Sequence, residues 1–152
     1  MPDRPTLAKQ CFCTGYTCCQ AVLTAVEDLL PLDHATLMRL AAPFGGGMAG
    51  TRQTCGAVTA MGMAMGLAFG DESPLPQPAK AALYAAVRTP AEQFAQRFGS
   101  MRCAELLAGL PGRLQAEPAL RDDAYYRVRP CAMFVEEATR LLQACLTENA
   151  AE

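Results

Sequence analysis

The segment 53–70 constrains the fold of this chain more than any other part of the sequence. It has no charged residue and it contains four glycines. Its length is at the lower limit for a membrane span, and the glycines loosen it further, so the pattern predicts a buried helix instead. We place this helix from about Arg52 to Phe69, with Gly70 as its C-terminal stop. Gly62 and Gly66 form a small-xxx-small pattern that, by analogy, would let another helix pack closely against it.

The rest of the chain is also predicted to be helical, because alanine and leucine dominate and strand-like alternation is poor. Helices are expected at about 17–30, 33–42, 79–87, 89–99, 100–107 and 130–146, and 111–129 is expected to be mostly loop. The sequence TPAE at Thr89 resembles a capped helix start with proline at the first helical position. We therefore predict a compact all-α, multi-helix bundle without a significant sheet. It would be a single domain over 1–152, with 1–14 as a mobile N-terminal segment.

Composition and charge exclude several classes of protein. The chain is 51% hydrophobic and 18% charged, which is typical of a packed globular domain. A net charge of -2 offers little attraction to a phosphate backbone, so we expect no nucleic-acid partner. The N-terminus has no apolar run of the secretory type, and no membrane span is expected, so the cytoplasm is the predicted compartment. A homo-oligomer remains open.

Eight cysteines are many for a chain of 152 residues. In a cytosolic protein they indicate metal binding or redox chemistry more than a disulfide framework. No two have the C-x-x-C spacing of a zinc knuckle or a thioredoxin motif. Any shared site must therefore be assembled by the fold from distant parts of the chain.

Four of the cysteines are predicted to lie at helix starts: Cys18, Cys55, Cys103 and Cys131. A helix N-terminus has partial positive charge and unpaired N–H groups, and both favour a thiolate over a thiol. The apolar faces of these helices suggest that the four converge on the interior. The alternative is that each cysteine is an inert, buried small hydrophobe.

A glycine-rich loop, FGGGMAG, precedes Cys55. Gly45, Gly46, Gly47 and Gly56 are the candidate cofactor-binding residues, because glycine lets the backbone approach a ligand and its N–H groups can support a thiolate or an anionic cluster. The literal G-x-G-x-x-G follows a helix and lacks a βαβ unit, so a dinucleotide site is not predicted. With Arg52 three residues before it, Cys55 is expected to be the most activated thiol, titrating below about 8.5.

Four segments in order resemble the C-GCAxxG-C-C family of putative redox-active proteins. They are YTCCQAVL, FGGGMAGTRQTCGAVTA, FGSMRCAELLAG and RPCAMFVEEATRLL. The resemblance covers most of the chain and implies that Cys18, Cys55, Cys103 and Cys131 are the family cysteines. The chain departs from the family pattern at Ala60, where glycine is usual, and at Cys19, where serine or alanine is usual. Whether Cys18 or Cys19 faces the site is left open.

Three functions remain in competition. In the first, the four cysteines form reversible disulfides and exchange electrons with a redox partner protein that the sequence does not identify. In the second, the same four thiolates are metal ligands that hold an iron–sulfur cluster or a soft metal. In the third, the chain is a structural or regulatory α-domain with inert cysteines. Whether the protein is an enzyme is not decided, and Cys11, Cys13 and Cys145 are predicted to be dispensable for the site.

Overall fold

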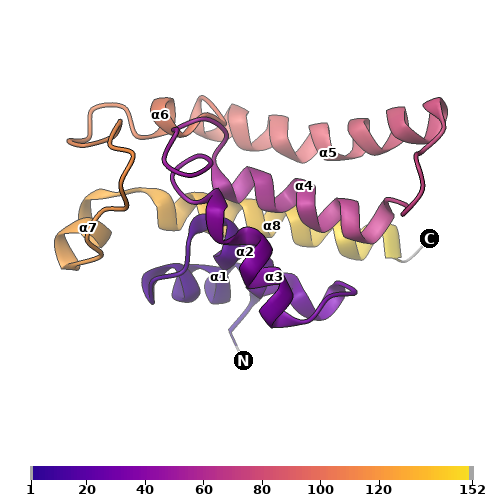
Figure 1. Ribbon diagram of the computed structural model, residues 1–152, viewed down its shortest axis with the longest axis horizontal. Coiled ribbons are helices and arrows are strands. Elements are labelled where there is room, and N and C mark those ends of the chain that lie inside the picture. The colour runs from indigo at the N-terminus through magenta and orange to yellow at the C-terminus, as the bar shows by residue number, and fades with distance from the viewer. Residues whose placement is uncertain (1, 151–152) are drawn as a thin grey trace.

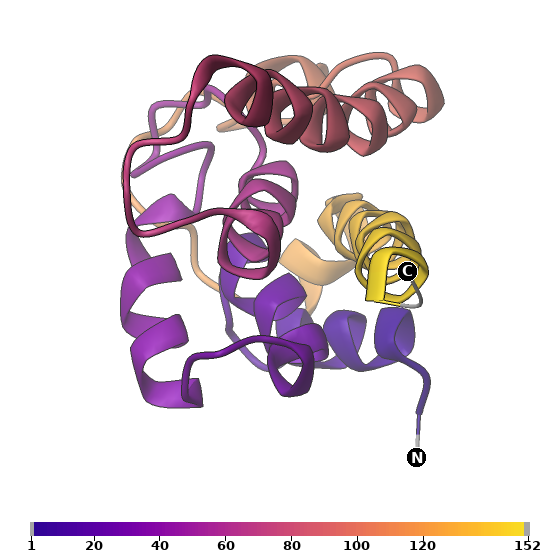
Figure 2. The same ribbon diagram turned by 90° about the vertical axis from the view of Figure 1, so that its right-hand side faces the viewer.

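Helices in three layers make up the fold, as Figure 2 shows in a view along the longer helices. The computed structural model describes residues 2–150, and side chains are described as far as residue 148. Within these residues there are eight α-helices and no strand, which confirms the all-α prediction. Their bounds are α1 (Arg4–Cys13), α2 (Cys18–Val26), α3 (His34–Ala41), α4 (Gly56–Phe69), α5 (Gln77–Phe98), α6 (Cys103–Leu106), α7 (Asp123–Val128) and α8 (Cys131–Ala150), with 3-10 turns at Glu27–Leu29 and Ala42–Phe44.

Helices α2, α4 and α8 pack against one another and form the centre of the core. Helix α1 covers α2 and α8 on one side, and α5 covers α4 and α8 on the other (Figures 1 and 2). As predicted, α4 is buried over several faces, with Ala57, Ala60, Met61, Ala64 and Met65 at 0% exposure. Core packing of this kind supplies most of the stability of short helices.

Side-chain caps fix where the helices near the cysteines begin. Thr17 and Gln20 form a capping box at α2: the Thr17 hydroxyl accepts from the Gln20 N–H at 3.2 Å, and Gln20 Oε1 accepts from the Thr17 N–H at 3.0 Å. Asp122 caps α7 by accepting from the Tyr125 N–H at 2.8 Å. These caps define the first residue of each helix and hence the direction of the side chains there.

The N-terminal segment differs from the mobile stretch expected for 1–14. Residues 4–13 form α1, which starts with an Asp3 cap that accepts from the Thr6 N–H at 2.8 Å. Ala8 and Phe12 of this helix are buried at 0% and 1% exposure. Helix α1 packs against α2 and α8. The sequence did not indicate this packing, because the apolar periodicity of α1 is weak.

Helix α5 corrects a predicted boundary. The expected helices at 79–87 and 89–99 are one continuous helix, with Pro90 inside it. Proline removes one backbone donor and normally breaks a helix. Here Pro90 is buried, its neighbour Ala91 is 8% exposed and Phe94 is 0% exposed, so burial of this face outweighs the lost hydrogen bond. The buried carboxylate of Glu137 also ties α8 to α5 through an ion pair with Arg97.

Gly62 and Gly66 of α4 do not mediate the close helix packing that the sequence suggested. A Cβ added at Gly66 would meet nothing within 4 Å, and one at Gly62 would only touch Val87 at 3.9 Å. Helices α4 and α5 are thus not held close by these glycines.

No helix within residues 2–150 combines the length and the apolar character needed to cross a bilayer.

Candidate functional site

Each of the four cysteines lies at a helix start, which confirms the prediction. Cys18, Cys103 and Cys131 are the first residues of α2, α6 and α8, and Cys55 is the N-cap of α4. Cys18 is half-buried, and the other three are no more than 9% exposed. The partial positive charge of a helix N-terminus therefore acts at each of these sulfurs.

The four cysteines line one cavity of about 50 Å³. It lies at the end of the molecule that carries α6, α7 and the glycine-rich loop (Figure 1). The cavity is also lined by Gly45, Gly46, Gly47, Gly56, Arg52, Arg121, Arg129, Tyr125, Leu106, Leu107 and Phe134. The convergence that the apolar faces suggested is present, and it joins residues from four parts of the chain.

Main-chain hydrogen bonds hold Cys55 beside Cys103. The Cys55 N–H donates to the Met101 carbonyl at 2.8 Å, and the Cys103 N–H donates to the Gln53 carbonyl at 2.6 Å. Gly47 makes this approach feasible, because a Cβ at this position would lie 2.6 Å from Cys103 Cβ. The loop and α6 therefore form one unit around these two sulfurs.

Gly56 plays a similar part at α2. An added Cβ there would lie 2.6 Å from the Phe44 carbonyl oxygen and 3.3 Å from Cys18 Cβ. Any larger residue would push α4 away from the start of α2. Glycine at this position thus sets the separation between Cys55 and Cys18.

The glycine-rich loop uses much of its own hydrogen-bonding capacity. The N–H groups of residues 49–53 donate to the carbonyls of Pro43, Gly45, Met48, Gly46 and Gly47, respectively, at 2.7–3.2 Å. These five donors are engaged within the loop and are not directed at a ligand. Cofactor binding by Gly45, Gly46, Gly47 and Gly56 stays a prediction, and the observed role of the loop is close packing.

Cys18 and Cys131 line this cavity together, and their thiols interact. This contact lowers the pKa of Cys131 below its usual range and raises the pKa of Cys18 well above it. Burial opposes the thiolate on Cys131, while Arg129, Arg121 and Arg52 favour it. Negative charge in this pair is therefore favoured on Cys131 over Cys18.

The expectation that Cys55 is the most activated thiol is wrong. The pKa of Cys55 is raised to about 12, mainly by burial and in smaller part by the neighbouring Cys131 and Cys103. The backbone N–H groups of Ala57 and Val58 act in the opposite direction but do not compensate. Desolvation outweighs the helix terminus at this sulfur.

Three arginines surround the cavity, and the sequence analysis singled out only Arg52. Arg52 is 7% exposed; its Nε and Nη2 donate to the Gln115 carbonyl at 3.1 and 2.7 Å, and its Nη1 lies 3.7 Å from Cys103 Sγ. Arg121 and Arg129 both stack on Tyr125, each with its guanidinium carbon 4.8 Å from the ring centroid. Arg121 and Arg129 lie just outside the two ends of α7, so no helical spacing in the sequence pointed to them.

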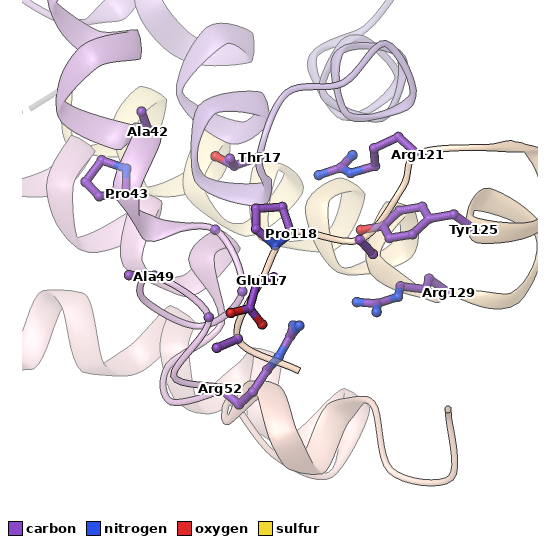
Figure 3. A pocket seen from close by; sticks show the side chains of 15 residues that line it. Thr17, Ala42, Pro43, Ala49, Arg52, Glu117, Pro118, Arg121, Tyr125 and Arg129 are labelled. Atoms are coloured by element: carbon purple, nitrogen blue, oxygen red, sulfur yellow. The ribbon is translucent and has the colours of Figure 1, made fainter. Parts of the chain in front are cut away.

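A second cavity of about 270 Å³ lies next to the first (Figure 3). The two share the lining residues Gly45, Gly46, Arg52, Arg121, Tyr125 and Arg129. Figure 3 shows the side chains of the three arginines around this space, with Glu117 and Pro118 on the segment that crosses it. We call the first space the cysteine cavity and the second the outer cavity.

The other cysteines lie outside the lining of the cysteine cavity. Cys19, which the sequence could not distinguish from Cys18, points the other way: its thiol donates to Met63 Sδ at 3.6 Å. Burial raises the pKa of Cys19 to about 12. Cys11, Cys13 and Cys145 do not line either cavity.

In the described part of the chain, the cysteines of the cavity are not arranged as metal ligands. Among residues 2–150, no three cysteine, histidine, aspartate or glutamate side chains are placed to hold one metal ion together. A structural or cluster site needs several thiolates directed at a common centre. The four cysteines share a cavity, but in this arrangement they do not make a ligand set.

One family model matches the chain over residues 16–145, and its description is "Putative redox-active protein (C_GCAxxG_C_C)". No curated protein gives a significant match, and no solved structure does. The matched range begins just before Cys18 and contains all four cysteines of the cavity. With this match over most of its length, the chain belongs to the C-GCAxxG-C-C family.

Proposed function

We propose that the protein transfers electrons by thiol–disulfide exchange, with Cys131 as the attacking thiol and Cys18 as the resolving thiol. The observation that carries this proposal is that Cys18 and Cys131 line one cavity together with two further cysteines. Three arginines at the same cavity favour the negative charge on Cys131. A thiolate next to a second thiol is the arrangement that such exchange requires.

The reaction proceeds in two exchanges. The Cys131 thiolate attacks one sulfur of an external disulfide, forms a mixed disulfide and releases the first thiolate product. Cys18 then loses its proton and attacks Cys131 Sγ, which forms the Cys18–Cys131 disulfide and releases the second product. Two electrons pass to the substrate; the proton of Cys18 ends on one product thiolate, and solvent supplies the proton for the other. A dithiol partner reverses the sequence and regenerates the protein.

Cys55 and Cys103 provide a second pair of thiols in the same cavity. The main-chain bonds between the loop and α6 keep them together whatever the state of Cys18 and Cys131. Exchange between the pairs would transfer the disulfide inward without any additional reactant. Cys55 has the less reactive thiol, since its pKa of about 12 leaves little thiolate at neutral pH.

The test is a single-turnover reaction of the anaerobically reduced protein with one equivalent of a small disulfide. Mass spectrometry of the alkylated digest should find the Cys18–Cys131 disulfide in the wild type and a trapped mixed disulfide at Cys131 in C18S. C145S is the matched control and should behave as the wild type. Reaction of C131S at the wild-type rate would overturn the assignment. Iron or another soft metal bound after anaerobic preparation would instead favour the cluster alternative.

A further inference from the structure

We propose that the outer cavity binds the carboxylate of a small anionic disulfide and presents its sulfurs to the cysteine cavity. This inference rests on the proposed function, because it names the substrate class of the same site. The space of about 270 Å³ is large enough for a small organic molecule and is continuous in its lining with the cavity of the four cysteines. The substrate is thus recognised at one end and reduced at the other.

The lining of the outer cavity contains more basic than acidic side chains. Arg52, Arg121 and Arg129 all line it, and none of them makes an ion pair with a carboxylate of residues 2–150. Glu117 is the acidic residue in the lining, and it also makes no ion pair. Three adjacent guanidinium groups, none of them paired with a carboxylate, attract an anion from solution.

The three arginines differ in how much of their hydrogen-bonding capacity is free. Arg52 is committed to the Gln115 carbonyl and to Cys103. Arg121 donates to the carbonyls of Phe12 and Tyr16 at 3.2 and 3.3 Å. These two arginines are held in place as fixed positive charges.

Arg129 is different, because its guanidinium makes no hydrogen bond to any described residue and only stacks on Tyr125. Stacking leaves the edge of the guanidinium plane available, and that edge matches the two oxygens of a carboxylate. Arg129 lines both cavities. We therefore assign Arg129 as the residue that binds the carboxylate directly.

The first experiment compares three disulfides of similar size that differ in charge: 3,3′-dithiodipropionate, 2-hydroxyethyl disulfide and cystamine. Each reacts with the reduced wild-type protein under single-turnover conditions at low ionic strength. The dianion should react fastest and the dication slowest, and added salt should reduce the difference. Equal rates for all three would overturn the anionic subsite while leaving the exchange function intact, whereas failure of all three would overturn the exchange function itself.

The second experiment separates substrate binding from thiol activation. R129Q removes a charge that also favours the Cys131 thiolate, so it should slow both the anionic and the neutral disulfide. Loss of a charged hydrogen bond should in addition lower the ratio of anionic to neutral rates by about 10-fold or more. R127Q changes the same charge on an exposed residue of α7 that lines neither cavity, and should leave this ratio unchanged. An unchanged ratio in R129Q would overturn the assignment.

A third measurement does not depend on redox chemistry. Suberate is the carbon analogue of 3,3′-dithiodipropionate and cannot be reduced. Calorimetry should detect suberate binding to the wild type and to R127Q, and at least about 10-fold weaker binding to R129Q. Suberate binding that is lost in R129Q would support the subsite even if no disulfide is reduced, and absence of binding to the wild type would overturn it.

Discussion

Cys131 and Cys145 lie on the same helix, about 21 Å apart along its axis, in two different surroundings. Cys131 is the first residue of α8 and lines a cavity with Cys18 and three arginines, and its pKa is lowered. Near the other end, burial and Glu148 raise the pKa of Cys145. The comparison indicates that a buried cysteine without positive charge nearby stays a thiol. A buried cysteine forms a thiolate when other segments supply positive charges and donors that lower its pKa.

The two ends also differ in how tightly the backbone packs. Gly47, with φ at 65°, abuts Cys103 and Gln53, whereas Gly66 at the far end of α4 has open space around its Cα. We expect G47A to lower the free energy of unfolding by about 3 kcal/mol, through overpacking and a left-handed backbone. G66A should raise it by about 0.5–1 kcal/mol, because alanine is the better helix former. Urea unfolding of both variants tests this, and equal effects would contradict the comparison.

Removing an arginine should also cost more stability beside the cysteine cavity than on the exposed face of α5. Arg121 donates to the carbonyls of Phe12 and Tyr16 and stacks on Phe12 at 4.6 Å, so R121A should cost about 2–3 kcal/mol of unfolding free energy. Arg88, exposed on α5, is the matched control, and R88A should change stability by less than about 0.5 kcal/mol. Thermal or urea unfolding measures both, and a neutral R121A would show that the segment over the cavity is held by other contacts.

Titration should distinguish the two cysteines of α8 directly. Alkylation against pH, followed for each cysteine by mass spectrometry, should give Cys131 a midpoint below that of a free thiol and Cys145 a midpoint above it. In C18A the midpoint of Cys131 should move to higher pH, because the thiolate loses the donor that lowers its pKa most. A Cys131 midpoint that is unaffected by C18A would remove the paired-thiol interpretation.

The smallest effect is expected for cysteines outside the site. Cys11, Cys13 and Cys145 line neither cavity, so a triple serine variant should keep the single-turnover rate of the wild type. The matched comparison is C131S, in which the rate should be lost. A triple variant that lost the reaction would place at least one of these three cysteines in the electron pathway.

Much of the fold could be predicted from the sequence, because the helices have strong local signals. The buried helix α4, the Asp33 start of α3 and the placement of four cysteines at helix starts follow from periodicity and capping. The continuous helix through Pro90 could not be predicted, since packing of Phe94 outweighs a local rule. Helix α1 could not be predicted either, because its apolar periodicity is weak and its contacts are with the distant helix α8 as well as α2.

That four cysteines meet in one cavity could be predicted, but the electrostatics around them could not. Local sequence cannot reveal that the thiols of Cys18 and Cys131 interact, because these residues come from different ends of the chain. It also could not show that burial suppresses Cys55 more than its helix terminus activates it. Arg121 and Arg129 come from a weakly patterned segment whose path over the cavity is decided by tertiary contacts.

The positions of Cys18 and Cys131 in the chain have a mechanical consequence. A covalent link between them would enclose roughly 110 residues, and loop closure of that length restricts the unfolded ensemble by an amount equivalent to about 4.7 kcal/mol. That is a large fraction of the stability of a typical domain. The oxidised protein would therefore resist heat and proteases much better than the reduced protein. Resistance to proteolysis would therefore depend on the redox state of the protein, and the oxidised form would survive longest.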